Sequence, residues 1–113
     1  MVARTALFAA PPFEVESEIR RLGADLRTAR LRRNLTIDEV ADKIGTGRRA
    51  VSDAEHGKPT TAVVTYAALL WVYGLLEGFG NLADASRDPE GMALVRSSER
   101  ARARTAELLN NDF

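Results

Sequence analysis

The chain of 113 residues contains no cysteine and a single histidine, His56. The missing cysteines exclude disulfide bonds, thiolate metal ligands and a thiol nucleophile. With one imidazole there is no histidine pair for a zinc site, and any acid–base scheme that uses histidine must use His56. We therefore expect no catalytic residue, no metal and no cofactor, and we do not expect an enzyme.

Long apolar runs are missing as well. No run approaches the roughly 20 apolar residues that cross a membrane, and the stretch 6–10 before Pro11 and Pro12 is too short for a signal peptide. We expect a cytoplasmic protein with no membrane contact. Valine and isoleucine together occur 11 times whereas alanine occurs 18 times, a composition that favours packed helices over a sheet.

The charge is balanced overall but uneven along the chain. Sixteen Lys and Arg face sixteen Asp and Glu, yet residues 20–58 hold ten of the basic residues and only six acids. A locally basic segment in a neutral chain is typical of a phosphate-binding surface.

Helical periodicity begins after Pro11 and Pro12, which separate an N-terminal arm (1–13) from a domain (14–87). Apolar residues at steps of four and three predict a first helix, at Val15, Ile19, Leu22, Leu26 and Ala29. Asn34 suits its left-handed end. After residue 74 we expect a weak helix over 75–83 and a C-terminal extension (88–113) with a short helix near Met92–Val95. From Arg96 we expect the extension to be mobile or ordered only by a partner.

Residues 36–57 form the most informative pattern. Thr36 and Glu39 predict a capping box at the start of one helix, and the turn 45–47 joins it to a second helix, 48–56. Two short helices joined by a glycine turn are typical of a helix-turn-helix. Arg48 and Arg49 then lie in the first turn of the second helix, where free N–H groups favour phosphate and arginine can pair with guanine.

Other interpretations of these residues are weaker. The stretch 45–50 also fits a dinucleotide-binding fingerprint, but that requires a preceding strand and residues 36–44 predict a helix. His56 suits the C-terminal end of its helix, and Tyr66, Trp71 and Tyr73 suit a core or a dimer contact. The basic tail is a solvated charge run or else contacts phosphate or a partner, through Arg96, Arg100, Arg102 and Arg104.

The motif residues resemble the Xre-type helix-turn-helix of Cro and the phage repressors over about residues 22–83. The match includes Leu35-Thr36, Glu39-Val40-Ala41, Ile44-Gly45, Arg48-Arg49, Val51-Ser52 and Glu55-x-Gly57-Lys58. The resemblance implies an all-α protein, a compact five- to six-helix bundle with flexible N- and C-terminal tails. It also implies a homodimer that binds a palindromic operator in double-stranded DNA with its third helix in the major groove.

Residue roles follow from this resemblance and from the placement of the charges. The candidates for base contact are Gly47, Arg48, Arg49, Ser52 and Asp53. The candidates for phosphate contact are Arg32, Arg33, Lys43, Thr46 and Lys58. The family also has a buried ion pair between its first and third helices, and here Arg30 and Glu55 occupy those positions.

Three residues depart from the family pattern. Ile37 stands where many members have a phosphate-contacting Gln, and Gly47 stands where Ser or Thr caps the recognition helix. Asp53 can accept from cytosine but repels phosphate. These departures motivate one alternative, an interaction adaptor that has lost DNA binding.

A closer resemblance, to HipB-like antitoxins, extends over nearly the whole chain. It includes the run Arg27–Arg33, the block Ala67–Leu76, the passage from Leu82 to Leu94 and the arginine-rich tail. It implies an antitoxin, nucleoid-associated when bound to DNA, that represses its own operon and neutralises a HipA-like serine/threonine kinase toxin. A stand-alone Xre-family regulator without a toxin is the further alternative.

Overall fold

The computed structural model describes residues 2–111 of the chain, with side chains described for residues 6–110. The described residues contain six α-helices, two 3₁₀ turns and no strand: α1 (Val2–Ala9), α2 (Phe13–Arg32), α3 (Ile37–Ile44), α4 (Arg48–Glu55), α5 (Val63–Val72), η1 (Phe79–Asn81), η2 (Ala85–Arg87) and α6 (Pro89–Asn111). The chain divides into two units, one ending at Glu77 and one beginning at Gly78.

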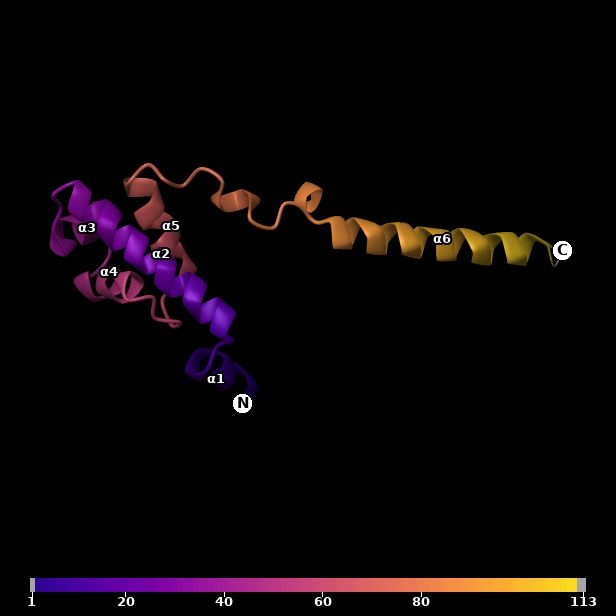
Figure 1. Ribbon diagram of the computed structural model, residues 1–113, viewed down its shortest axis with the longest axis horizontal. Helices are drawn as coiled ribbons and strands as arrows, with labels where there is room; N and C mark the ends of the chain where they lie inside the picture. Colours follow the sequence, from indigo (N-terminus) through magenta and orange to yellow (C-terminus); the bar gives the residue numbers. More distant parts are fainter. Residues whose placement is uncertain (1, 112–113) are drawn as a thin grey trace. The chain divides into compact units, whose positions relative to one another are not determined.

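The first unit has one hydrophobic core, made by α2, α3, α4 and α5 (Figure 1). Its centre consists of four fully buried aliphatic side chains, Leu26, Val40, Val51 and Leu69. One comes from each helix. In α2, α3 and α4 the apolar residues recur at spacings of three and four on one face, whereas α5 is apolar on nearly all sides and buries Tyr66 and Leu69. The core therefore fixes the four helices against one another.

The ends of α2 and α3 follow local sequence rules. Glu14 and Glu16 lie in the first turn of α2 and Arg30 and Arg32 in its last, which complements the helix dipole. Asn34 adopts a positive φ of 53° just after α2. The predicted capping box is confirmed, since Thr36 Oγ1 accepts from the Glu39 amide and Glu39 Oε1 from the Thr36 amide, both at 3.1 Å.

The prediction of an all-α protein is confirmed for the described residues, but only four of their six α-helices share the core, which corrects the predicted compact bundle of five to six helices. The expected helix over 75–83 is absent; this region holds only the short turn η1, and η2 follows it. Gly74 and Gly78 both adopt positive φ, so the backbone leaves the helical conformation on either side of Leu75 and Leu76. The hydrophobic pattern suggested a helix there, but the glycines prevent it.

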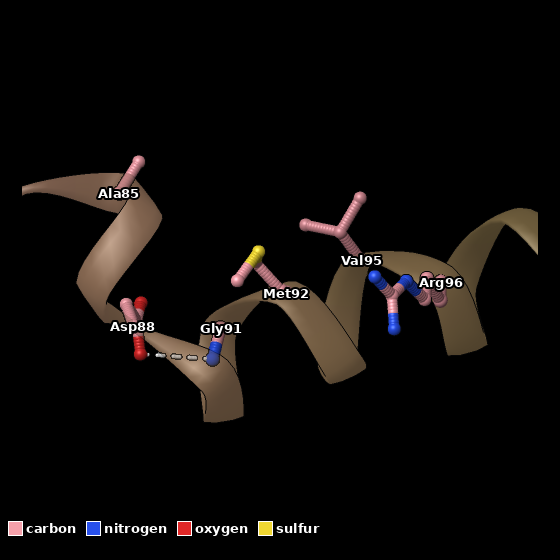
Figure 2. Close-up of a pocket in the computed structure, with 6 residues that line it drawn as sticks. All are labelled: Ala85, Asp88, Gly91, Met92, Val95 and Arg96. Atoms are coloured by element: carbon pink, nitrogen blue, oxygen red, sulfur yellow. Dashed lines mark hydrogen bonds between the residues drawn. The ribbon is translucent and has the colours of Figure 1, made fainter.

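Both terminal segments are more helical than predicted. Residues 2–9 of the expected N-terminal arm form α1. The expected short helix and mobile tail after residue 88 are one helix of 23 residues, α6. Asp88 caps it by accepting from the Gly91 amide at 2.9 Å (Figure 2). Alanine, arginine and leucine make up most of its second half, and all three favour helix even without an apolar period.

None of the helices in the described part of the chain is long and apolar enough to cross a membrane.

Candidate nucleic-acid interface

The helix pair α3 and α4 meets at a turn built on glycine. Gly45 ends α3 with φ of 77°, a left-handed conformation that few other residues adopt without strain. Gly47 is the N-cap of α4 and offers no side-chain cap. The first backbone amides of α4 therefore donate to no N-cap side chain. This leaves the start of the helix open to an external anion.

Arg48 and Arg49 are exposed at this open helix end. Arg48 Nε lies 3.9 Å from Asp38 Oδ1, and both side chains are 70% exposed. A solvated pair at that distance contributes little and is easily exchanged for another partner. Both arginines can thus turn toward a ligand at low cost.

The opposite side of α4 is fixed in the core. Val51 and Ala54 are fully buried and Glu55 is 9% exposed. Ser52 and Asp53 are half-buried at the edge of this packing. Because the buried side of α4 is held by the core, the orientation of its exposed side, which carries Arg48 and Arg49, is fixed as well.

Close contact with α2 strengthens this orientation. A Cβ added at Gly23 would lie 2.4 Å from the Ala54 carbonyl oxygen and 2.8 Å from that of Glu55. Only glycine allows the two helices to approach so closely. Sequence reasoning missed this role, because Gly23 lies inside a helical pattern where glycine is otherwise only a weak helix former.

Arg30 and Glu55 form a buried, two-pronged ion pair between α2 and α4. Arg30 Nε lies 2.7 Å from Glu55 Oε2, and Nη2 lies 3.0 Å from Oε1. Arg30 Nη1 also donates to the Leu35 carbonyl oxygen at 2.9 Å. The hydrogen bonds to Glu55 outweigh burial and raise the pKa of Arg30 above its usual value. The pair ties α2, α4 and the loop after α2 together.

Arg33 has a structural role in the fold. Its guanidinium donates to the carbonyl oxygens of Ala29 at 2.8 Å and Tyr73 at 2.9 Å. It also lies over the Tyr73 ring, 5.3 Å from the centroid. These contacts join the end of α2 to the end of α5, so a phosphate contact by Arg33 would have to displace them.

Asp53 and Lys58 are paired. Lys58 Nζ lies 3.0 Å from Asp53 Oδ1, which joins a predicted base contact to a predicted phosphate contact. The Asp53 carboxylate partly neutralises the Lys58 ammonium. A phosphate group would have to compete with this carboxylate for Lys58. Asp53 lies in the last turn of α4 and Lys58 just beyond its end, where the Lys58 amide also donates to the Asp53 carbonyl oxygen at 3.1 Å.

The remaining predicted residues lie around the helix pair. Arg32 and Lys43 are exposed in the last turns of α2 and α3, and Thr46 is half-buried in the turn. His56 is exposed, and its Nδ1 lies 2.7 Å from the Ser52 carbonyl oxygen. This places His56 as the closing residue of α4.

Comparison with protein families agrees with this geometry. A family model described as a helix-turn-helix domain matches residues 21–78, just over half of the chain. The chain belongs to this helix-turn-helix family. The match covers α3, the glycine turn and α4, and it supports DNA binding by an Xre-like protein. Searches of curated proteins and of solved structures found no match.

Proposed function

We propose that this helix-turn-helix protein is a sequence-specific transcriptional regulator that inserts α4 into the major groove. The observation that supports this best is the pair Arg48 and Arg49, exposed on the first turn of a helix whose other side is fixed by the core. In the proposal these arginines contact guanine edges. Gly47 allows close approach, and Ser52 and Asp53 contact the neighbouring bases.

Backbone contacts complete the proposed interface. Arg32, Lys43, Thr46 and Lys58 surround the helix pair with side chains that can bind phosphate. Each phosphate neutralised by a cation releases counterions, so the affinity should fall steeply as salt rises. Arg33 is assigned to the fold because both of its bonded nitrogens are used by carbonyls.

We propose that the active species is a homodimer on a palindromic operator. The first unit exposes large apolar side chains on α5 and just after it, Val64, Trp71 and Leu75, at 69%, 63% and 50%. Val64 and Trp71 are seven residues apart and lie on one side of α5, as a dimer contact requires, and Leu75 follows just after the end of the helix. Two recognition helices would then enter grooves about 34 Å apart.

We propose further that the regulator is the antitoxin of a HipA-like kinase. This rests on the resemblance of the block 67–76 and of the arginine-rich tail to HipB-like antitoxins. A stand-alone regulator would share the DNA interface but have no kinase. An adaptor without DNA binding is disfavoured by the exposed arginines, although Ile37 and the Asp53–Lys58 pair weaken the interface.

Two measurements test these proposals in turn. Fluorescence anisotropy with DNA from upstream of the coding region, against shuffled DNA at several salt concentrations, tests operator binding. Equal affinity for both DNAs would contradict sequence-specific recognition.

Purification of the tagged chain from its host, with nuclease and high salt, tests the antitoxin role. A kinase retained in near-equal amount supports it, and the chain alone favours the stand-alone regulator.

A further inference from the structure

The basic residues of α6 are exposed and have no acidic partner. Every residue from 92 to 110 is exposed, and Gly91 is the one residue of 89–110 that is even half-buried. All the basic residues of this helix are arginines, namely Arg96, Arg100, Arg102 and Arg104. The ion pairs among the described side chains lie between residues 16 and 58. The guanidinium groups of α6 therefore keep their charge available to an external anion.

Three of these arginines lie in a row. At about 100° per residue, residues four apart lie within about 40° of each other around a helix. Arg96, Arg100 and Arg104 have this spacing, and successive members are about 6 Å apart along the axis at about 1.5 Å per residue. Arg102 lies about 160° from Arg100, on the opposite side of the helix. We call the row of three the arginine stripe.

Small side chains lie among the arginines of the stripe. Ala93, Ser97 and Ala103 are on this face, so no bulky side chain would hold an anionic surface away from it. Glu107 lies on the same face and ends the stripe on its C-terminal side, whereas Glu99 lies about 100° from the centre of the stripe. The stripe is thus continuous and contains no acid between residues 91 and 106.

A row of arginines suits a row of phosphates. A guanidinium group binds a phosphate through two parallel N–H groups, which the ammonium of lysine cannot do. Nucleic-acid backbones carry phosphates at regular intervals, whereas carboxylates on a protein surface have no such regularity. Contacts to the backbone carry no direct information about the bases. The stripe is therefore suited to nucleic acid of any sequence.

An anionic membrane fits the opposite side of α6 less well. A helix that lies in a membrane surface needs a continuous apolar face. Here Ser98, Arg102 and Thr105 interrupt that side between Leu94 and Leu108. The combination of a basic stripe with an interrupted apolar side favours nucleic acid over a membrane.

We propose that α6 binds the phosphate backbone of duplex DNA through Arg96, Arg100 and Arg104, without reading the base sequence. The choice of duplex DNA among nucleic acids rests on the proposed function of the first unit. The contact itself lies in the second unit and adds to the phosphate contacts proposed around α4. It raises the affinity of the chain for any duplex and makes that affinity more dependent on salt.

The arginine stripe has a matched control on the same helix. Arg100→Gln and Arg102→Gln each remove one exposed positive charge, and glutamine favours helix nearly as well as arginine does. Anisotropy titrations with random-sequence duplex DNA at several salt concentrations give the slope of log affinity against log salt. We expect the magnitude of this slope to fall by about one in Arg100→Gln, because a phosphate contact is lost. Arg102→Gln should keep the wild-type slope.

Removal of an acid should act in the opposite direction. Glu107→Gln should raise the affinity for random DNA, because its carboxylate lies on the face of the stripe and repels phosphate. Glu99→Gln is the control, because it removes the same charge away from the stripe, and it should raise the affinity less. Circular dichroism of these variants checks that α6 stays helical.

A second background separates this contact from the proposed operator recognition. With Arg48 and Arg49 both changed to alanine, we expect the preference for operator DNA to be lost and the difference between Arg100→Gln and Arg102→Gln to remain. If the wild type shows no preference for operator DNA but the difference is present, the stripe is supported and the proposed function is contradicted.

Equal slopes in Arg100→Gln and Arg102→Gln would overturn the proposal, whether or not operator DNA is preferred. Equal reductions would mean that only the net charge of α6 matters. No reduction in either variant would mean that α6 does not contact DNA and that its exposed arginines face another partner, such as an acidic protein surface.

Discussion

At the scale of single residues, the interface combines a fixed support with exposed contact groups. Arg30 and Glu55 are buried and hydrogen-bonded to each other, whereas Arg48 is 70% exposed. A buried ion pair is costly to break from one side, by about 3–5 kcal/mol, yet adds little net stability. The pair serves mainly to hold α4 in position against α2, so that the side of α4 with Arg48 and Arg49 faces outward.

Arg48→Ala should weaken operator binding by about 1–3 kcal/mol and narrow the gap between operator and random DNA, because a base contact is lost. Anisotropy titrations on both DNAs measure this. Arg27→Ala is the control, because Arg27 is also an exposed arginine but lies on α2 outside the proposed contacts. An equal loss on both DNAs would mean that Arg48 does not contact a base.

Asp53→Asn should raise affinity for random DNA, because Lys58 loses the carboxylate that lies 3.0 Å from its ammonium and the surface loses a negative charge. The operator should gain less, because Asp53 is also a proposed base contact. Lys58→Ala should lower affinity for both DNAs and reduce the salt slope by about one. Salt titrations of the two variants check this. An unchanged slope in Lys58→Ala would remove Lys58 from the phosphate contacts.

At the scale of secondary-structure elements, α2 and α4 depend on the absence of a side chain at Gly23. Gly23→Ala should lower the thermal unfolding midpoint by an amount equivalent to about 1–3 kcal/mol, since overpacking forces the helices apart. Circular dichroism melts measure this. Gly80→Ala, where an added Cβ meets nothing within 4 Å, is the control. A melt unchanged in Gly23→Ala would contradict the close approach.

Local rules predicted the elements that they govern. Capping at Thr36 and Glu39, the turn at Gly45 and the apolar spacing of α2 are determined by residues close in sequence, and the structure agrees with them. The long helix α6 was missed because its second half has no apolar period, although its residues favour helix. Propensity over many residues outweighed the missing pattern.

The site was predictable in type but not in its internal contacts. The spacing of the motif predicted exposed arginines at the start of α4. The bonds of Arg33 to Tyr73, forty residues away, depend on how α2 and α5 pack. No pattern among neighbouring residues predicts a hydrogen bond between groups so far apart in the sequence. The sequence therefore predicted a phosphate contact for Arg33, because it did not reveal the carbonyl partners that Arg33 has in the fold.

At the scale of the whole molecule, a dimer through α5 predicts a change at Trp71, the single tryptophan. Its emission should shift to shorter wavelength as protein concentration rises, because a ring that is 63% exposed becomes buried. Val64→Glu should abolish the shift and weaken operator binding. A dimer by sedimentation without any shift would mean that the first units associate through another face.

The residues proposed for DNA recognition all lie in the unit that ends at Glu77, whereas α6 lies in the unit that begins at Gly78, with only short turns between α5 and α6. We expect substitutions in one unit to leave the contacts within the other unit intact. After gene duplication, a descendant could keep its operator and acquire a new partner, or keep its partner and move to another promoter.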